Sequence, residues 1–259
     1  MSEVDAIIVG IIQGLTEFLP ISSSGHIEIA RYFLNSNLLP AENLLLTIFL
    51  HLATALSTII IFKKDIIDLI SGALNFNNNS LSYILKILIS IIPAGLIGFF
   101  LNDYIKNFFS GNIKLVGLML FVTGVLLFIS KFVKKKERKI TNLDSLIIGL
   151  AQAIAIIPGI SRSGATISTS IILGHNKNNA AKFSFLIVIP LIIGAALNDI
   201  LNGNFSESRI DISILIFGFI SALLTGLIAC KLMIKIVNDN NLIYFAFYCF
   251  ALGLICVLI

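Results

Sequence analysis

The sequence predicts an all-α membrane protein that crosses the bilayer several times. Of its 259 residues, 57% are hydrophobic and only 12% are charged, and the mean hydropathy is +1.00. An ordinary soluble domain carries about 25% charged residues, so a soluble chain of this length could not hide so much apolar surface. Long apolar runs and an internal repeat favour the same fold class. The net charge of +4 is modest, and no nucleic-acid-binding pattern is present.

Six apolar runs are long enough, or nearly long enough, to cross the hydrocarbon core, which requires roughly 20 residues of helix. They are Leu44–Phe62, Ile84–Leu101, Leu115–Ser130, Phe183–Leu197, Ile212–Cys230 and Leu242–Ile259. We therefore expect six spanning helices in a single integral membrane domain that covers residues 1–259. The three Cys lie in the late apolar segments and are expected to serve packing, not a metal site or disulfides.

Two polar segments interrupt the apolar pattern and resemble each other. One is GIIQGLTEFLPISSSG, which begins at Gly10, and the other is GLAQAIAIIPGISRSG, which begins at Gly149. Alignment pairs Gly10 with Gly149, Gln13 with Gln152, Ser22 with Ser161, Ser24 with Ser163 and Gly25 with Gly164. Internal symmetry of this kind is common in membrane folds built from two halves, here approximately residues 1–133 and 140–259.

Each related segment consists of a short apolar stretch, a break that contains Pro, Ser and Gly, and a second short stretch. Because such pieces are too short to cross the bilayer, each segment is expected to form a re-entrant helix–turn–helix hairpin. Irregular backbone at membrane depth is tolerated only where it faces protein or a wet cavity. The two turns are therefore expected to line one polar pocket.

The distribution of basic residues predicts the orientation. Three spans in each half turn the second half upside down relative to the first, as in transporters with inverted-topology repeats. If the loop Lys131–Lys139 is cytoplasmic, most of the 18 Lys and Arg residues lie inside, as the positive-inside rule requires. The first hairpin then enters from outside and the second from inside, and both termini are external.

Glu17 and Arg162 are the charged residues that are hardest to accommodate in a membrane. An ionised side chain at the bilayer centre costs at least ~2.5–3.5 kcal/mol, and such residues are functional candidates by default. A buried ion pair that holds the halves together is one interpretation. We favour a functional site, because the surrounding polar groups are more than one ion pair needs. These groups are Ser22, Ser23, Ser24, His26, Ser161 and Ser163.

Gln13 and Glu17 are the candidate metal ligands. They lie four residues apart and therefore share a helix face. Two oxygen-bearing groups near a wet cavity suit a hard divalent cation such as Mg²⁺, which also takes water and substrate phosphate oxygens as ligands. Hydrogen bonding between helices is the alternative role for Gln13.

The stretches PISSSGH and PGISRSG are each expected to lead from a turn into a helix. A Ser in this position is an ordinary N-cap, and for Ser22 or Ser24 alone capping is the simpler role. Helix N-termini also bind phosphate through free N–H groups and the helix dipole, and Arg162 adds a forked donor. The predicted phosphate-binding residues are Ser22, Ser24, Gly25, Ser161, Ser163 and Gly164.

Ser23 and His26 are the candidate nucleophile and general base. A Ser–His pair can form an activated nucleophile, and Ser23 aligns with Arg162, so both are expected to point from the turn tips into the pocket. In the alternative, His26 activates water directly and Ser23 only binds phosphate. Of the other histidines, His51 is expected to be structural and His175, in a polar loop, to be solvated.

The motifs EFLPISSSGH and PGISRSGAT closely resemble the two signature regions of the undecaprenyl-diphosphate phosphatase family, the bacitracin-resistance type of integral membrane enzyme. The hydrophobic layout is similar along nearly the whole chain. The resemblance implies hydrolysis of undecaprenyl diphosphate to undecaprenyl phosphate and inorganic phosphate, which recycles the lipid carrier for peptidoglycan. It implies Glu17, Ser23, His26 and Arg162 as catalytic residues. Gln13 departs from the pattern, because many members carry Glu there, and this lowers the negative charge at a metal site.

The resemblance also implies a divalent cation, Mg²⁺ or Ca²⁺, and an active site open to the outer face of the bacterial cytoplasmic membrane. The expected partners are a polyprenyl diphosphate substrate and membrane lipid, without nucleic acid. A transporter or flippase of a lipid phosphate is the alternative function, because inverted repeats with re-entrant hairpins are a transporter architecture. The oligomeric state stays open, with a homodimer as one form.

Overall fold

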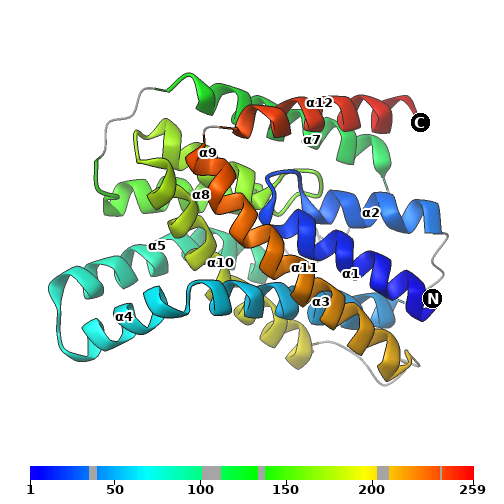
Figure 1. Cartoon of the computed structure of the whole chain (residues 1–259), viewed down its shortest axis with the longest axis horizontal. Helices are drawn as coiled ribbons and strands as arrows, with labels where there is room; N and C mark the ends of the chain where they lie inside the picture. The colour runs from blue at the N-terminus through cyan, green and yellow to red at the C-terminus, as the bar shows by residue number, and fades with distance from the viewer. Residues whose placement is uncertain (35–39, 101–111, 134–137, 203–209, 240) are drawn as a thin grey trace.

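The computed structural model describes residues 1–34, 40–100, 112–133, 138–202, 210–239 and 241–259. Over these residues the chain forms eleven helices and no strand, so the predicted all-α class is confirmed (Figure 1). The helices are α1 (Glu3–Phe18), α2 (Ser23–Leu34), α3 (Pro40–Ile61), α4 (Lys63–Leu74), α5 (Asn78–Phe100), α7 (Ile113–Lys131), α8 (Asn142–Ile154), α9 (Arg162–Ile172), α10 (Lys177–Asn202), α11 (Ile212–Asn238) and α12 (Leu242–Leu258).

Five of these helices are long and apolar enough to cross a membrane, and they make the chain an integral membrane protein. The spans are Glu42–Ile61, Asn78–Phe100, Ile113–Lys131, Lys177–Leu201 and Ile212–Asn238. Each coincides with one of the predicted runs, although Leu101, the end of one run, lies outside the described residues. The sixth predicted run forms α12, whose 17 residues fall slightly short of the roughly 20 that a straight crossing needs.

Both related polar segments fold as two short helices joined by a turn. α1 has 16 residues and α2 has 12, while α8 has 13 and α9 has 11. The turns are the short segment between Phe18 and Ser23 and the longer one between Ile154 and Arg162. The predicted helix–turn–helix form is therefore present in both segments.

The sequence repeat extends to the hydrogen bonds that begin α1 and α8. Ser2 caps α1 in a capping box with Asp5, and Thr141 caps α8 in a capping box with Asp144. In a capping box the two side chains satisfy each other's backbone N–H groups, which would otherwise lack a partner. The alignment that pairs Gly10 with Gly149 also pairs these caps.

Each motif helix packs on a helix of the other predicted half. α1 lies along α11, and α8 lies along α5 (Figure 1). Glycine allows both close approaches: a Cβ atom built on Gly10 would lie 2.5 Å from the Gly218 carbonyl oxygen, and one built on Gly149 would lie 2.5 Å from that of Ser90. Small residues commonly permit such backbone contact between membrane helices.

The main hydrophobic core packs against the first turn and α9, while Ala155 and Ile160 of the second turn belong to a separate small cluster. In the main core, Phe18 and Phe185 pack edge to face, with ring centroids 5.7 Å apart, and Ile167 of α9 is fully buried in the same cluster. Cys230, Cys249 and Cys256 are unpaired thiols buried there, so their predicted packing role is confirmed.

Candidate active site

Glu17, at the end of α1, and Arg162, at the start of α9, form an ion pair that joins the two turns. The Arg162 Nη2 atom lies 2.5 Å from the Glu17 Oε1 atom, and the two side chains are only 14% and 7% exposed. A second guanidinium nitrogen of Arg162 donates to the backbone carbonyl of Ser184 on α10 at 3.4 Å. The buried ion pair, which the sequence offered as the alternative to a functional site, is therefore present, and the functional role of the two residues stays a prediction.

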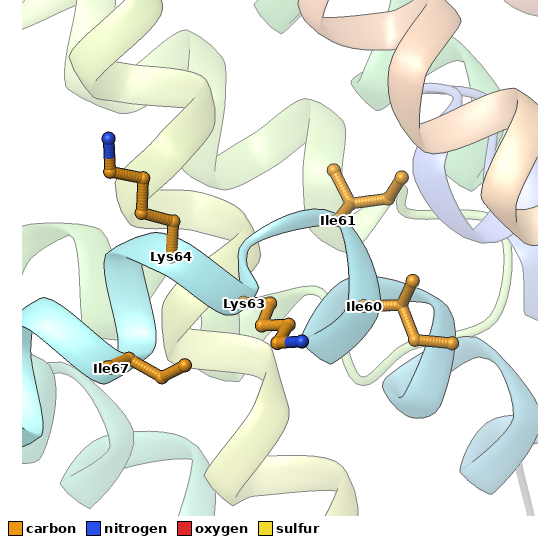
Figure 2. Close-up of a pocket in the computed structure, with 5 residues that line it drawn as sticks. All are labelled: Ile60, Ile61, Lys63, Lys64 and Ile67. Atoms are coloured by element: carbon orange, nitrogen blue, oxygen red, sulfur yellow. The ribbon is translucent and has the colours of Figure 1, made fainter.

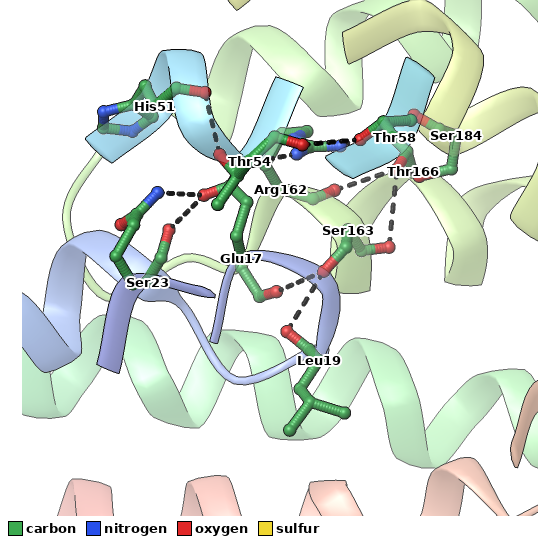
Figure 3. A network of polar contacts seen from close by, with 12 residues as sticks. Glu17, Leu19, Ser23, His51, Thr54, Thr58, Arg162, Ser163, Thr166 and Ser184 are labelled. Carbon is green, nitrogen blue, oxygen red and sulfur yellow. Dashed lines mark hydrogen bonds and ion pairs between the residues drawn. The ribbon is translucent and has the colours of Figure 1, made fainter. Parts of the chain in front are cut away.

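The Glu17 carboxylate accepts hydrogen bonds from residues of three helices (Figure 3). Its Oε2 atom accepts a hydrogen bond from the Ser23 hydroxyl at 2.7 Å and another from the Gln13 amide at 3.1 Å. With Arg162 on Oε1, donors from α1, α2 and α9 converge on one side chain. A carboxylate that is already bonded to a serine hydroxyl is placed to accept the proton of that hydroxyl.

The two turns also touch through their serines. The Ser22 hydroxyl accepts a hydrogen bond from the Gly159 N–H group of the other turn at 3.2 Å. The Ser163 hydroxyl donates to the Leu19 carbonyl at 3.2 Å. These contacts place the two serine-rich turns against each other, as the sequence predicts.

Capping is the role that the geometry gives to Ser22 and Ser161. The Ser22 hydroxyl accepts from the Gly25 N–H group at 3.2 Å, and the Ser161 hydroxyl accepts from the Gly164 N–H group at 3.1 Å. The neighbouring hydroxyls follow the same symmetry: Ser24 Oγ lies 3.3 Å from Ser22 Oγ, and Ser163 Oγ lies 3.2 Å from Ser161 Oγ. That these residues bind phosphate as well stays a prediction.

His26 does not contact Ser23, although the sequence suggested a nucleophile–base pair. The His26 Nδ1 atom lies 2.8 Å from the Ser22 carbonyl oxygen, and its Nε2 atom lies 2.8 Å from the Tyr248 hydroxyl. Both ring nitrogens are therefore engaged, while the Ser23 hydroxyl bonds to Glu17. The expected Ser23–His26 contact is wrong for this structure, because the two side chains leave the first turn of α2 toward different partners.

The family model for the bacitracin resistance protein BacA matches residues 6–255. The chain belongs to the BacA family. Curated relatives of this BacA-family chain are named undecaprenyl-diphosphatase. One from Christiangramia forsetii is 50% identical over 251 residues, which cover 96% of this chain and 95% of the relative. One from Bacteroides thetaiotaomicron is 45% identical over 98% of this chain and 97% of the relative. One from Methanococcus vannielii is 38% identical over 96% of each chain.

The residues of this BacA-family chain fit a divalent cation in part. The Gln13 side chain is fully buried and its Oε1 atom has no hydrogen-bond partner, so one oxygen ligand is available. The Glu17 Oε2 atom already accepts two hydrogen bonds and Oε1 accepts one, so a cation could bind at Oε1 and would have to displace a donor only at Oε2. Over the described residues no three His, Cys, Asp or Glu side chains come together as a metal site. A bound cation would therefore need oxygens from substrate or water.

Several polar residues near the site of the BacA-family chain carry no sequence signal. Thr166 on α9 and Ser184 on α10 share a hydrogen bond of 2.6 Å between their hydroxyls, beside Arg162 (Figure 3). Tyr248 lies in the apolar helix α12, outside both motifs. The Nδ1 atom of His51 lies 2.8 Å from the Thr47 carbonyl oxygen within α3, and its structural role stays a prediction.

His175 was expected to be solvated and is instead 2% exposed. Its Nδ1 atom lies 3.0 Å from the Arg138 carbonyl oxygen, and its Nε2 atom lies 3.4 Å from the Asp144 carboxylate. The loop that carries His175 therefore covers the beginning of α8. The prediction failed because the polar residues that follow His175 indicate only that the loop lies at the surface. They do not indicate that the His175 side chain packs on the inner side of the loop, against α8.

A cavity of about 360 Å³ lies apart from this site, at the corner between α3 and α4. Figure 2 shows its lining by Ile60, Ile61, Ile67, Lys63 and Lys64. None of these residues belongs to either motif. The candidate active site is instead the largely buried polar cluster around Glu17.

Proposed function

We propose that this chain hydrolyses undecaprenyl diphosphate to undecaprenyl phosphate and inorganic phosphate, the reaction that the name of its relatives describes. One observation carries the proposal: the two turns bring a serine hydroxyl, a carboxylate and a guanidinium together as Ser23, Glu17 and Arg162. Phosphoryl transfer depends mainly on positioning and on neutralising charge, and a buried guanidinium is well suited to phosphoryl oxygens.

In the first step, the Ser23 oxygen attacks the terminal phosphorus of the lipid diphosphate. The proton of the hydroxyl passes to Glu17, to which it is already hydrogen-bonded at 2.7 Å. The new bond joins Ser23 to phosphorus, and the bond from phosphorus to the bridging oxygen breaks. Undecaprenyl phosphate leaves, and Arg162 exchanges its contact with Glu17 for the phosphoryl oxygens.

In the second step, water attacks the phosphoserine and releases inorganic phosphate. The serine oxygen regains its proton from Glu17, while the Nε2 atom of His26 accepts the proton of the water and later releases it to solvent. In the alternative route, His26 activates water that attacks the diphosphate directly, and Ser23 only binds phosphate. The two routes differ in whether the Ser23 oxygen becomes phosphorylated.

A divalent cation, Mg²⁺ or Ca²⁺, is part of the proposal. The Gln13 amide oxygen and the Glu17 carboxylate would hold it, and when bound it would neutralise charge on the diphosphate. The unpartnered and buried Gln13 Oε1 atom supports this assignment. Since Gln13 is uncharged, substrate oxygens have to complete the ligand set.

We further propose that α1–α2 and α8–α9 are re-entrant hairpins of an inverted repeat with halves of approximately 1–133 and 140–259, and that α12 is the sixth span. The reciprocal packing of α1 on α11 and of α8 on α5 supports this symmetry. Figure 1 places both termini at the same end of the molecule, which is consistent with three spans in each half. The protein then resides in the bacterial cytoplasmic membrane, with the site open to the outer side. A homodimer stays a prediction.

The test is phosphate release from undecaprenyl diphosphate by the purified full chain in lipid vesicles. We expect release that stops when a chelator removes divalent cations and resumes when Mg²⁺ or Ca²⁺ is added back. A flippase would instead move the lipid phosphate between leaflets without releasing phosphate. Failure of the wild-type chain to release phosphate with either cation would overturn the proposed function.

A further inference from the structure

The hydrogen bonds of His26 fix its tautomer. A carbonyl oxygen can only accept a hydrogen bond, so the Nδ1 atom, 2.8 Å from the Ser22 carbonyl, must carry the hydrogen. In a neutral imidazole the Nε2 atom then holds the lone pair. The partner of Nε2 must therefore be a donor.

The Tyr248 hydroxyl is that donor, at 2.8 Å from Nε2. The two rings stack with centroids 5.7 Å apart and an interplanar angle of 10°. Tyr248 lies on α12, 222 residues further along the chain than His26. The carbonyl of Ser22, in the turn between α1 and α2, thus holds the imidazole at Nδ1, and α12 holds it at Nε2.

The Ser22 carbonyl is itself held rigidly in place. Ser22 has a φ of +70°, a left-handed conformation that costs a non-glycine residue energy and needs support from its surroundings. The support comes from the two N–H groups, of Gly25 and Gly159, that donate to its hydroxyl. The same carbonyl also accepts the His26 backbone N–H group at 3.1 Å, so the strained turn anchors both the helix start and the ring.

We infer that Tyr248 is a positioning residue for the proposed hydrolysis: its hydroxyl holds His26 as the Nδ1–H tautomer with the Nε2 lone pair directed toward α12. This inference rests on the proposed function. Because Ser23 delivers its proton to Glu17, the lone pair of His26 is reserved for a second proton, that of the attacking water. When the water delivers its proton, it takes the place of the Tyr248 hydroxyl at Nε2, because Nδ1 already carries a hydrogen.

The test compares Tyr248→Phe with Tyr244→Phe, which removes the same hydroxyl from the same helix. Tyr244 is 68% exposed and takes no part in the site, so its variant should match the wild-type chain. For Tyr248→Phe we expect kcat for phosphate release to fall about tenfold, the upper end of the scale for one hydrogen bond between neutral groups, with KM unchanged. The double variant His26→Ala/Tyr248→Phe should be no slower than His26→Ala alone, because both changes remove the same unit.

Equal kcat values for the two Phe variants, or additive losses in the double variant, would overturn the inference. Nitrogen NMR of the three histidines in the substrate-free protein supplies a readout that does not need activity. The signals that His26→Ala removes belong to His26, and in the wild-type chain they should report an Nδ1–H tautomer. Tyr248→Phe should shift the Nε2 signal of His26. An Nε2–H tautomer in the wild-type chain would refute the contact. Absence of phosphate release with the NMR signature intact would instead point to a failure of the proposed function alone.

Discussion

The two turns share one scaffold and present different chemistry. In both, a serine caps the N–H group three residues later and a second serine hydroxyl lies close to the first. The residue that opens the following helix differs: it is Ser23 in the first turn and Arg162 in the second. The two segments therefore share the same turn structure. The first residue of the following helix supplies the hydroxyl in the first copy and the guanidinium in the second.

The turns also differ in where they bear backbone strain. In the first, Ser22 itself is left-handed at a φ of +70°, whereas the corresponding Ser161 has an ordinary φ of −76°. The second turn places its left-handed residue at Gly159, with a φ of +97°. Relative to the aligned serine, the left-handed residue stands two positions earlier in the second turn, and Pro158 stands one position earlier than Pro20 does. Glycine adopts this conformation at little cost, so the strain in the first turn is a feature of that turn alone.

The largest effect is expected from changing the group at the tip of the first turn. If Ser23 is the nucleophile, Ser23→Ala should lower kcat for phosphate release by at least ~1,000-fold, because loss of a covalent nucleophile is rarely compensated. Ser82→Ala, on an exposed face of α5, is the matched control and should be silent. Substantial turnover by Ser23→Ala would remove the covalent route and leave direct attack by water.

The tip of the second turn should give the next largest effect. Arg162→Ala should lower kcat by ~100- to 1,000-fold, the usual cost of losing one charge-stabilising donor. Arg162→Lys should recover part of the loss, since it keeps the charge without the fork. Arg138→Ala, which removes the arginine partner of the buried Asp144 carboxylate, should leave kcat of the folded protein unchanged. Wild-type kcat in Arg162→Ala would contradict the role of Arg162 in phosphoryl binding.

Removal of Arg162 leaves Glu17 buried without its countercharge, which destabilises the protein by itself. The double variant Glu17→Gln/Arg162→Ala controls for this, because it removes both charges. Thermal unfolding should show greater stability of the double variant than of Arg162→Ala, while phosphate release stays lost in both. The difference in unfolding temperature gives the structural contribution of Arg162, and the kcat of Arg162→Lys, which keeps a charge beside Glu17, gives the catalytic one.

The comparison of the turns shows which contacts of the candidate site the sequence predicts and which it does not. The repeat and the cost of membrane charge were sufficient to bring Glu17, Ser23 and Arg162 together. The partner of each side chain was not predictable, because it depends on which way the first residues of α2 face. His26 was paired with Ser23 by proximity in sequence, whereas its true partner lies on α12. A lone Tyr in an apolar helix has no pattern that distinguishes it from a packing residue.

In the fold as well, the sequence predicts individual elements better than the contacts between them. Apolar runs predicted five membrane helices closely, because length and hydropathy determine a span. α4 was not predicted, since its 12 residues mix lysines, aspartates and isoleucines and extend beyond the end of α3. The reciprocal packing of α1 and α8 on the opposite halves was also beyond the sequence, although Gly10 and Gly149 were among the aligned positions that now explain it.

Those two glycines provide a symmetric test of the packing. Gly10→Ala and Gly149→Ala should each destabilise the protein by ~1–3 kcal/mol, because the added methyl group meets backbone at 2.5 Å in both cases. Gly95→Ala is the control, since no atom lies within 4 Å of its added Cβ, and it should unfold like the wild-type chain or slightly later. Thermal unfolding in one detergent measures all three. A large loss at only one of the two repeat positions would show that the halves do not pack equivalently.

The capping boxes of α1 and α8 should give the smallest and most pH-dependent difference. Burial raises the pKa of Asp144, but hydrogen bonds from Arg138 and Thr141 outweigh it and lower the pKa to about 2. A carboxyl with a folded pKa below its ordinary 3.8 stabilises the protein above that value, and the contribution is lost as the pH falls toward 2. Asp144→Asn should therefore cost ~1–2 kcal/mol near neutral pH and almost nothing in strong acid.

Asp5 occupies the position in α1 that Asp144 occupies in α8, but it has fewer hydrogen-bond partners. It therefore serves as the comparison for Asp144. Its pKa is lowered mainly by the backbone and side-chain hydrogen bonds with Ser2, and no arginine contacts it within the described part of the chain. Asp5→Asn should therefore change the unfolding temperature less than Asp144→Asn at every pH, with the two curves converging in acid. Equal shifts would mean that the capping box alone, and not the Arg138 ion pair or the burial beneath His175, accounts for the stability that Asp144 contributes.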